Sequence, residues 1–599
     1  MPDCPTEPWS APRPRHTLAL GAILALALAL RLAHWWAVRE QPFFAWLAMD
    51  SQEYDRWARE IAAGDWLGSQ VFFQAPLYPY LLAALYTVFG RSLDAVYLVQ
   101  IGLAVAGCHA LYRAGREMGG ENVGLGAALL AALYGPFLFY DAQLAKESPA
   151  VAVTCFLLWV LAAARGRPGT WRWLGAGALL GVLALLRENA LLLLPFLVPL
   201  AWSREGGARA FLRRGGALVA GLVLALLPVA LRNGVVGGDF LPTTFQGGVN
   251  FYIGNNPQAD GTYQPIVPGK QIPALERREP VRIAEQAAGR RLTGGEVSRY
   301  WLRRSLAWAR REPGAFLRLQ VRKLGMFWSW YEWPDAVDYY HVKTLSSVLR
   351  LPLLEFGGAV LLALAGLVLA RARARRHLDP FAPVLLFTLG WMLSTVAFFL
   401  FARYRLPAVP ALLVLGGVTL ARLAEARRPG LAAIVLAALL LPRAVGFEPR
   451  MDLVEYNLGR LYEEQGQPAA AQEHYQAAFV LNPRDFLACL NLGNLAARQG
   501  EWATALRFYQ RAAALEPRSD DAESNQGGVY LAMGDLAEAQ THLDRALALN
   551  PQNLPALQNK SLLLARRGDL PGARELNRRL LELDPANPAG LRLRGRLGG

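Results

Sequence analysis

Apolar stretches that recur through three quarters of the chain constrain its fold more than any other feature. A helix needs ~20 apolar residues to cross the hydrocarbon core of a membrane. Most of the stretches suit a membrane-spanning helix in length and composition, and several are shorter. Because the bilayer interior offers backbone groups no water, segments of this kind cross it as helices. The pattern predicts an all-α, polytopic transmembrane bundle of about 11 spans over residues 18–446, after a cytoplasmic tail of residues 1–17. The stretches lie near residues 18–36, 92–111, 121–140, 148–164, 173–186, 190–202, 215–231, 350–370, 381–401, 406–421 and 430–445.

The distribution of charge indicates which side of the membrane each connection occupies. Residues 450–599 hold 17 basic and 18 acidic residues, a net charge of −1, so residues 1–449 carry +16 and account for the formal net charge of +15. There, arginines gather between alternate apolar stretches, among them Arg113 and Arg116, and Arg165 and Arg172. Basic residues favour the cytoplasmic side, and this arrangement suits membrane topology better than a nucleic-acid groove. We therefore expect a multi-pass plasma (inner) membrane protein without a nucleic-acid partner. Its outer loops would be residues 37–91 and 232–349, and everything after residue 446 would also lie outside the cytoplasm.

The last quarter of the chain is a repeat with a step of 34 residues. Pro483, Pro517, Pro551 and Pro585 keep this step. Glycines and alanines keep it too, at Gly466, Gly500, Gly534 and Gly568 and at Ala471, Ala505, Ala539 and Ala573. This period is that of tetratricopeptide repeats, in which small residues lie where two helices cross. Residues 450–585 are thus predicted to form an α-solenoid of four repeats, followed by a C-terminal tail of residues 586–599.

Ionisable groups at the outer ends of the apolar stretches are the candidates for chemistry, because charges beside a bilayer are costly and often functional. A carboxylate opposite several cations suits a reaction in which a base activates a hydroxyl while the cations hold a phosphate leaving group. No Walker loop or dinucleotide fingerprint is present, which disfavours a soluble nucleotide donor. No metal-ligand spacing stands out and no cofactor is predicted, although a divalent metal is left open. The candidates are Asp50 and Glu147 as catalytic carboxylates, Lys146, Arg187, Arg403 and Arg405 as phosphate-binding cations, and Glu53, Asp141 and Glu332 as further site residues.

Several of these residues stand in motifs that resemble those of GT-C glycosyltransferases, over about residues 18–445. The nearest branch is the dolichyl-phosphate-mannose protein mannosyltransferase-like one, which includes lipid A aminoarabinose transferases. The first loop carries the resemblance at residues 50–54 (DSQEY) and 74–79 (QAPLYP). Further motifs are Lys146-Glu147 and residues 186–189 (LREN), 254–257 (GNNP), 327–332 (FWSWYE) and 403–407 (RYRLP).

The resemblance implies a polyprenyl-phosphate sugar donor, catalysis on the outer face and inversion at the anomeric carbon, with Asp50 in the place of the first-loop Asp. Protein mannosyltransferases follow that Asp directly with a Glu, whereas Ser51 follows Asp50 and Glu53 comes later. Specificity for protein mannosylation therefore does not carry over. The main hypothesis is a membrane glycosyltransferase whose repeats recruit a protein or glycan acceptor, since solenoids present concave binding surfaces.

Most of these candidates also have a purely structural interpretation. Asp50 would be the N-cap of the helix that follows it, and Glu147 would face the N-terminal dipole of its own helix. Lys146 and the three arginines would be anchors at lipid headgroups, and Glu332 would belong to an aromatic belt at the interface. For the whole chain, the alternatives are a ligase for oligosaccharide or cell-wall polymers and a non-enzymatic envelope scaffold. A transporter lacks support, because no paired broken-helix halves are visible.

Overall fold

A computed structural model describes residues 14–165, 167, 169–203, 206–268, 270, 273–373, 379–426 and 429–597. Within these ranges the chain is helical and has no strand, which confirms the all-α prediction. It divides into two compact units, Met1–Gln264 with Ile272–Pro449, and Pro265–Gln271 with Arg450–Gly599. Of the predicted N-terminal tail, residues 1–13 lie outside the described residues.

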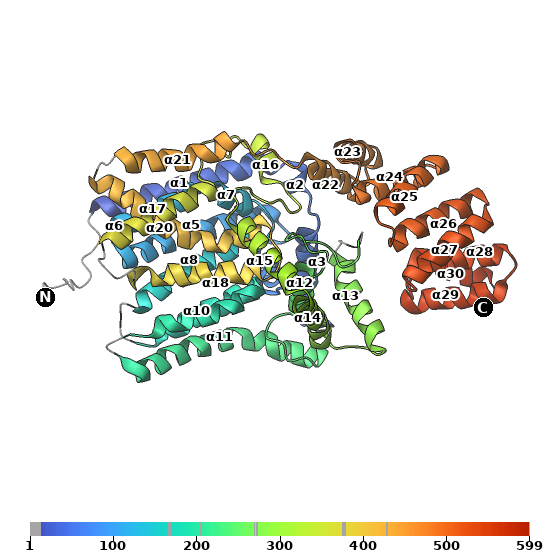
Figure 1. The fold of residues 1–599 in the computed structure, drawn as a ribbon, viewed down its shortest axis with the longest axis horizontal. Helices are drawn as coiled ribbons and strands as arrows, with labels where there is room; N and C mark the ends of the chain where they lie inside the picture. The colour runs from blue at the N-terminus through green and yellow to red at the C-terminus, as the bar shows by residue number, and fades with distance from the viewer. Residues whose placement is uncertain are drawn as a thin grey trace. The chain divides into compact units, whose positions relative to one another are not determined.

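The first unit is a bundle of apolar helices that lie side by side (Figure 1). By length and composition, six helical segments suffice to cross a membrane. These are α1 (Pro14–Val38), α5 (Leu93–Gly119), α8 (Glu147–Arg165), α11 (Gly207–Gly237), α18 (Ala382–Val396) with the turn before it, and α19 (Ala402–Arg405) with α20 (Val409–Ala426). Shorter apolar helices accompany them, namely α4 (Leu77–Phe89), α6 (Glu121–Ala132), α9 (Trp171–Leu186), α10 (Leu194–Leu197) with its flanking 3-10 turns, α17 (Phe356–Arg373) and α21 (Pro429–Val445). Every predicted apolar stretch thus coincides with helical structure, while the number of spans stays a prediction.

Glycines let neighbouring helices of this bundle approach closely. A Cβ atom on Gly177 of α9 would come within 1.8 Å of the Leu218 carbonyl oxygen of α11. Conversely, a Cβ atom on Gly221 of α11 would come within 2.0 Å of the Leu174 carbonyl oxygen of α9. Small residues of this kind let helix backbones make close van der Waals contact where hydrophobic burial gives little drive.

The apolar stretch 121–140 differs from its prediction, because it forms two helices rather than one. Between α6 and α7 (Gly135–Asp141), the backbone leaves the helix and bonds to a distant segment. The Gly135 N–H donates to the Leu354 carbonyl at 2.8 Å, and the Leu354 N–H donates to the Leu133 carbonyl at 2.9 Å. These bonds satisfy backbone groups that the break would otherwise leave unpaired.

The predicted outer loops contain short helices. The first holds α2 (Pro42–Ala45), α3 (Asp50–Ala62) and α4, and the second holds α12 (Gln246–Gly254), α13 (Pro273–Ala288), α14 (Gly294–Arg311), α15 (Pro313–Trp328) and α16 (Tyr339–Leu345). The apolar side of α3 packs on protein, since Tyr54 and Ile61 are buried and Tyr54 meets the Tyr78 ring edge-on at 5.3 Å. Trp66, which follows α3, is 58% exposed.

The second unit consists of paired helices, as the repeat predicts. The pairs are α22 (Met451–Glu464) with α23 (Pro468–Leu481), α24 (Phe486–Arg498) with α25 (Trp502–Leu515), α26 (Asp520–Met533) with α27 (Leu536–Leu549), and α28 (Leu554–Arg566) with α29 (Leu570–Leu583). The repeated alanines are fully buried where helices cross, and the repeated glycines adopt positive φ angles in the turn inside each pair. Within the predicted tail, α30 (Pro588–Arg596) packs on the last pair through Leu593, and residues 598–599 lie outside the described residues.

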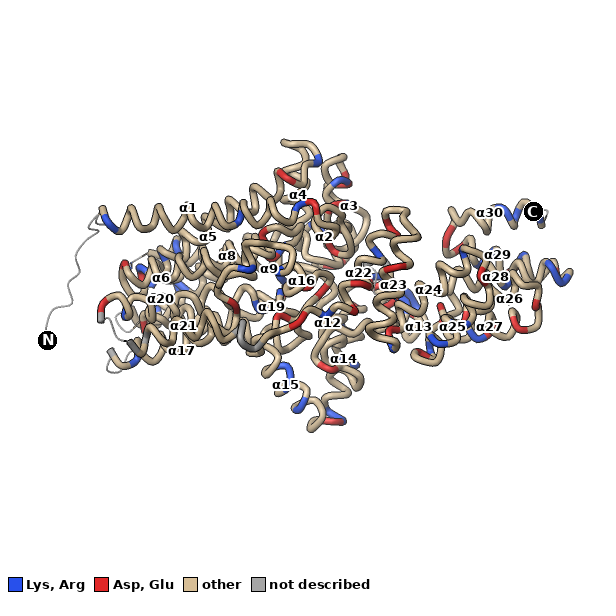
Figure 2. Tube along the Cα trace, turned by 90° about the horizontal axis from the view of Figure 1, so that it is seen from above, with Lys and Arg blue, Asp and Glu red and all other residues tan. Residues whose placement is uncertain are grey.

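Figure 2 marks the charged residues along both units. Those of the apolar helices gather near helix ends, whereas those of the paired helices are spread along their length.

Candidate active site

Asp50 is the first residue of α3 and follows the N-cap residue Met49. Met49 has a φ of 53°, and it is the only non-glycine residue with a positive φ in the part of the chain that the structure describes. No side chain caps α3, so the interpretation of Asp50 as the N-cap is wrong. Backbone strain of this kind often accompanies functional positions. Here it immediately precedes a carboxylate that is 30% exposed.

Arg403 of α19 joins three carboxylates that come from distant parts of the first unit. Its Nη1 lies 3.0 Å from Asp50 Oδ2 and 3.8 Å from Glu147 Oε1, and its Nη2 lies 2.9 Å from Asp335 Oδ2. Arg403 is itself 15% exposed, against 30% for Asp50 and 32% for Asp335. The two aspartates are therefore the most accessible members of this group.

Glu147 and Arg187 form a deeper ion pair behind Arg403. Glu147 begins α8, Arg187 is the C-cap of α9, and their side chains are 1% and 7% exposed. The two guanidinium groups, of Arg187 and Arg403, lie 4.7 and 5.4 Å from the centre of the Tyr404 ring. Glu147 Oε2, Arg187 Nε and Arg403 Nε are buried and have no hydrogen-bond partner among the described residues. These atoms leave hydrogen-bonding capacity that a ligand can satisfy.

Lys146 is the cation of this region that no carboxylate holds. It is 8% exposed, and within the described ranges its ammonium has no recorded hydrogen bond or ion pair. Burial lowers the pKa of Lys146, while the nearby carboxylates of Glu188, Glu147 and Asp50 act to raise it. Glu188 is in turn fixed by the Gln246 amide, which donates to its Oε1 at 2.7 Å. A buried ammonium without a direct partner is suited to bind an anion.

These residues define the Asp50 cluster: Asp50, Lys146, Glu147, Arg187, Glu188, Asp335 and Arg403. Burial alone would raise the pKa of Asp50, but Arg403 and Lys146 outweigh it and hold that pKa below its usual value. Asp50 is therefore ionised at neutral pH, as a general base must be. For Asp335, burial prevails over the attraction of Arg403 and raises the pKa.

Four predicted candidates have partners outside this cluster, namely Arg405, Glu332, Asp141 and Glu53. Arg405 lies over the Phe356 ring at 3.9 Å, pairs with Glu332 at 3.0 Å, and donates to backbone carbonyls of Phe327, Ser329 and Tyr331. Its guanidinium thus holds the segment that follows α15.

Asp141 and Glu53 also form ion pairs outside the cluster. Asp141 accepts from Arg31 of α1 at 2.8 Å and from the Ser148 hydroxyl, inside the bundle. Glu53 pairs with Arg277 of α13 at 2.8 Å and so joins two helices of the outer loops. Neither carboxylate contacts Arg403 or Lys146 in the recorded interactions.

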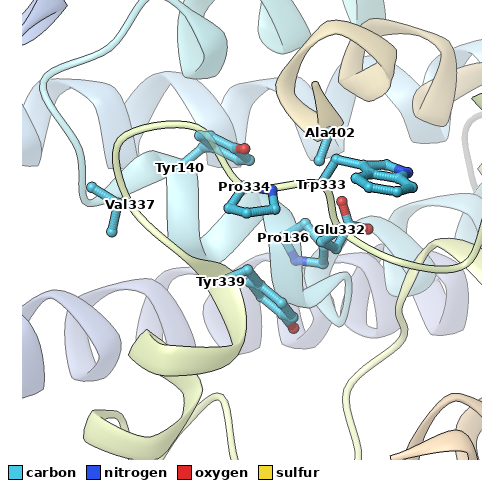
Figure 3. Close-up of a pocket in the computed structure, with 8 residues that line it drawn as sticks. All are labelled: Pro136, Tyr140, Glu332, Trp333, Pro334, Val337, Tyr339 and Ala402. Atoms are coloured by element: carbon cyan, nitrogen blue, oxygen red, sulfur yellow. The ribbon is translucent and has the colours of Figure 1, made fainter. Parts of the chain in front are cut away.

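Glu332 lines a tightly packed crevice beside the cluster, which has no room for a water molecule. Figure 3 shows the rings of Tyr140, Trp333 and Tyr339 around it, together with Ala402, which directly precedes Arg403. Glu332 Oε1 and Trp333 Nε1 are buried there without hydrogen-bond partners among the described residues. These aromatic rings form one wall of the site.

Two carboxylates near Asp50 were not among the predicted candidates. Asp335 follows the aromatic segment by two residues, and its place in a predicted outer loop was the only signal available in the sequence. Glu276 of α13 accepts from the Tyr263 hydroxyl, and burial raises the pKa of Glu276 to about 7. No local pattern marks Glu276. Across the described ranges, no group of three His, Cys, Asp or Glu side chains is arranged to hold a metal ion.

Comparisons with known proteins agree with this division of the chain. Residues 74–231 match the family model described as dolichyl-phosphate-mannose-protein mannosyltransferase. Residues 456–522 and 525–588 match the tetratricopeptide repeat. No curated protein matches the chain at a significant level.

Solved structures resemble the repeat region. The TPR domain of Arabidopsis OM64 is 20% identical, with a TM-score of 0.18, and the match covers 19% of this chain and 93% of that one. MamA is 24% identical, with a TM-score of 0.21 and coverage of 27% and 93%. PilF of Pseudomonas aeruginosa is 20% identical, with a TM-score of 0.23 and coverage of 30% and 79%.

Proposed function

From a chain that joins a mannosyltransferase-like segment to tetratricopeptide repeats, we propose a membrane glycosyltransferase that uses a polyprenyl-phosphate sugar. It transfers the sugar to an acceptor on the outer face of the membrane, with inversion. The observation that carries this proposal is the Asp50 cluster, in which an accessible, ionised carboxylate lies beside Arg403 and near the unpaired Lys146.

The chemistry follows from this arrangement. An acceptor hydroxyl attacks the anomeric carbon on the face opposite the lipid phosphate, and Asp50 takes its proton as the new carbon–oxygen bond forms. The bond to the phosphate oxygen breaks, and the lipid phosphate leaves with the electron pair. Lys146 and Arg403 stabilise the charge that develops on that oxygen. A poor nucleophile and an anionic leaving group are thereby assisted at the same time.

Asp50 suits the role of base better than Glu147 does. Glu147 is 1% exposed and paired with Arg187, so an acceptor cannot reach it without disrupting that pair. We assign Glu147 to holding Arg187 in place. The contact of Asp50 with Arg403 also links the two halves of the reaction, because a donor phosphate that draws Arg403 away makes Asp50 a stronger base.

The repeats supply a surface for a protein acceptor or partner. A hollow of about 450 Å³ lies against α24, α25 and α26. It is lined mainly by polar side chains, namely Asn494, Arg498, Tyr509, Asp521 and Asn525, with Leu490. Solenoids use surfaces of this kind for binding.

The site and the repeats are proposed to lie outside the cytoplasm of a plasma membrane. A reporter that is active only in the cytoplasm, fused after Gly599, should be silent. A bright reporter would place the repeats in the cytoplasm and imply an even number of spans.

The decisive experiment compares Asp50→Asn with Asp65→Asn, a change of an exposed carboxylate in the same loop. General-base catalysis contributes about 100- to 10,000-fold in rate. Asp50→Asn should therefore insert and bind lipid donor normally, but lose at least about 100-fold in sugar transfer, while Asp65→Asn keeps full activity. A non-enzymatic scaffold predicts no sugar transfer by the wild-type protein, and a polymer ligase predicts transfer from an oligosaccharide donor only.

A further inference from the structure

The Asp50 cluster contains one more carboxylate than it contains cations. Asp50, Glu147, Glu188 and Asp335 face Lys146, Arg187 and Arg403, so the fully ionised cluster has a surplus negative charge. Each arginine already contacts at least one carboxylate.

A phosphate donor brings a further negative charge to this site. In a medium of lower dielectric constant than water, like charges within a few ångströms repel strongly, and an uncompensated buried charge is costly. Binding must therefore add a positive charge or remove a negative one. The inference that follows rests on the proposed function, because it concerns the same lipid phosphate.

Of the three carboxylates that share Arg403, Asp335 has the fewest other cationic neighbours. Among the described residues its one cationic contact is Arg403, which it shares with Asp50 and Glu147. Asp50 is additionally stabilised by Lys146 and Arg187, and Glu147 by its own pair with Arg187. If Arg403 turns to a phosphate, Asp335 loses its only opposing charge.

The other carboxylates near Asp335, namely Asp50 of α3, Glu147 of α8 and Glu276 of α13, favour its neutral form. The phenols of Tyr140 and Tyr404 also face it but are uncharged, and the Ala336 N–H, which donates to its carboxylate, favours the ionised form. Burial already raises the pKa of Asp335 in the absence of a ligand. At 32% exposure, the carboxyl group can receive a proton from solvent.

We propose that the donor phosphate displaces Asp335 from Arg403 and that Asp335 takes up a proton as the phosphate binds. The proton comes from solvent and adds to a carboxylate oxygen of Asp335. The net charge of the cluster together with its bound phosphate therefore equals the net charge of the empty cluster. Asp335 is thus a positioning residue, which holds Arg403 in the empty site and releases it to the donor.

The test measures proton uptake directly. The full chain in lipid nanodiscs is titrated with a short-chain polyprenyl methyl phosphodiester, whose single charge does not titrate near neutral pH. Calorimetry in buffers of different ionisation enthalpy gives the number of protons bound. Uptake should approach one proton as the pH rises from 7 to 8.5, and the affinity should then fall about tenfold per pH unit.

Two variants assign the proton. Asp335→Asn should bind the probe without proton uptake and with an affinity that no longer depends on pH. Glu276→Gln is the matched control, because Glu276 is the other nearby carboxyl group with a raised pKa, and it should keep the wild-type uptake.

Each remaining outcome is informative. Binding by the wild-type protein without proton uptake overturns the inference, and so does uptake that persists in Asp335→Asn, whether or not it disappears in Glu276→Gln. Binding that a chelator abolishes overturns it as well, since a divalent cation would then balance the charge. If the wild-type protein does not bind the phosphodiester at all, the proposed function fails as well.

Discussion

The two units of this protein are both helical, but ion pairs are buried inside the first unit more often than inside the second. In the repeat unit, the positions where helices cross are small or apolar. Gly459 and Gly493 receive the rings of Tyr475 and Tyr509, for example, and the equivalent Gly527 receives Leu543. In the first unit, ion pairs are buried between the helices. The side chains of Arg31 and Asp141, Arg187 and Glu147, and Arg405 and Glu332 are all at most 7% exposed.

This difference separates stability from function. A buried ion pair often contributes little net stability, because desolvation offsets the attraction, but removal of one partner is strongly destabilising. The second unit runs that risk at Lys270 and Asp520, whose side chains are 9% and 4% exposed, and it gains stability from contacts that recur in every repeat. The first unit runs it at several pairs, and its Asp50 cluster provides the charged groups that phosphate chemistry needs.

The largest effect on stability is expected from the buried pair in the bundle. Asp141→Ala leaves Arg31 without its carboxylate and should destabilise the first unit by about 3–5 kcal/mol. Asp379→Ala is the control, because Asp379 pairs with Arg165 at 2.6 Å but is 74% exposed. Exposed pairs contribute about 0.2–1 kcal/mol. Thermal aggregation in detergent, followed by size-exclusion chromatography, measures both, and equal midpoints for the two variants would contradict the comparison.

Two buried lysines should differ in what they contribute. Lys146→Met removes a cation that has no recorded partner, so the fold should survive while affinity for a polyprenyl phosphodiester falls by about 1.5–3 kcal/mol. Lys323 donates to the carbonyls of Gly254 and Phe398 and to Asn255 Oδ1. Lys323→Met leaves these acceptors unsatisfied and should cost about 1–3 kcal/mol in stability.

Donor titrations and melting curves on both lysine variants measure the affinity and the stability that these expectations concern. Unchanged donor affinity in Lys146→Met would remove this residue from the site. A destabilised Lys146→Met would show instead that its role is structural.

Local sequence patterns accounted for the helices and the repeats, because hydrophobic period and turn glycines act over a few residues. They could not pair Asp50 with Arg403, which lie 353 residues apart and meet only through tertiary packing. The break between α6 and α7 depends in the same way on backbone bonds to Leu354. Asp335 escaped notice because it stands in an irregular segment without periodicity.

A smaller effect is expected from one glycine of the repeats. Gly534 has a φ of 86°, where a side chain is strained, so Gly534→Ala should destabilise its repeat by about 1 kcal/mol. Gly595 lies in helix α30 with open space where a Cβ atom would be, so Gly595→Ala should stabilise by about 0.5–1 kcal/mol. Hydrogen exchange in the pair α26–α27 and in α30 should shift in opposite directions. A shift of the same sign in both would show that backbone conformation does not decide these positions.

The smallest effect on donor binding is expected from removal of the whole repeat array. Each repeat contacts mainly its neighbours, so the array forms its own stability unit. None of the residues in the Asp50 cluster belongs to that unit, which comprises Pro265–Gln271 and Arg450–Gly599. Truncation after Pro449 should therefore leave affinity for the polyprenyl phosphodiester within about twofold of wild type, a difference of under ~0.5 kcal/mol.

Transfer to the natural acceptor should nevertheless be lost on truncation, because the recruiting surface is gone. Lys270, which belongs to the second unit and pairs there with Asp520 at 3.6 Å and with Asp521, loses these partners as well. Lys270→Ala in the full chain is the matched control for that loss, and it should keep both activities. Full-rate transfer by the truncated protein would show that the repeats do not recruit the acceptor. Loss of donor binding on truncation would show instead that the two units depend on each other, and the contrast between them would no longer hold.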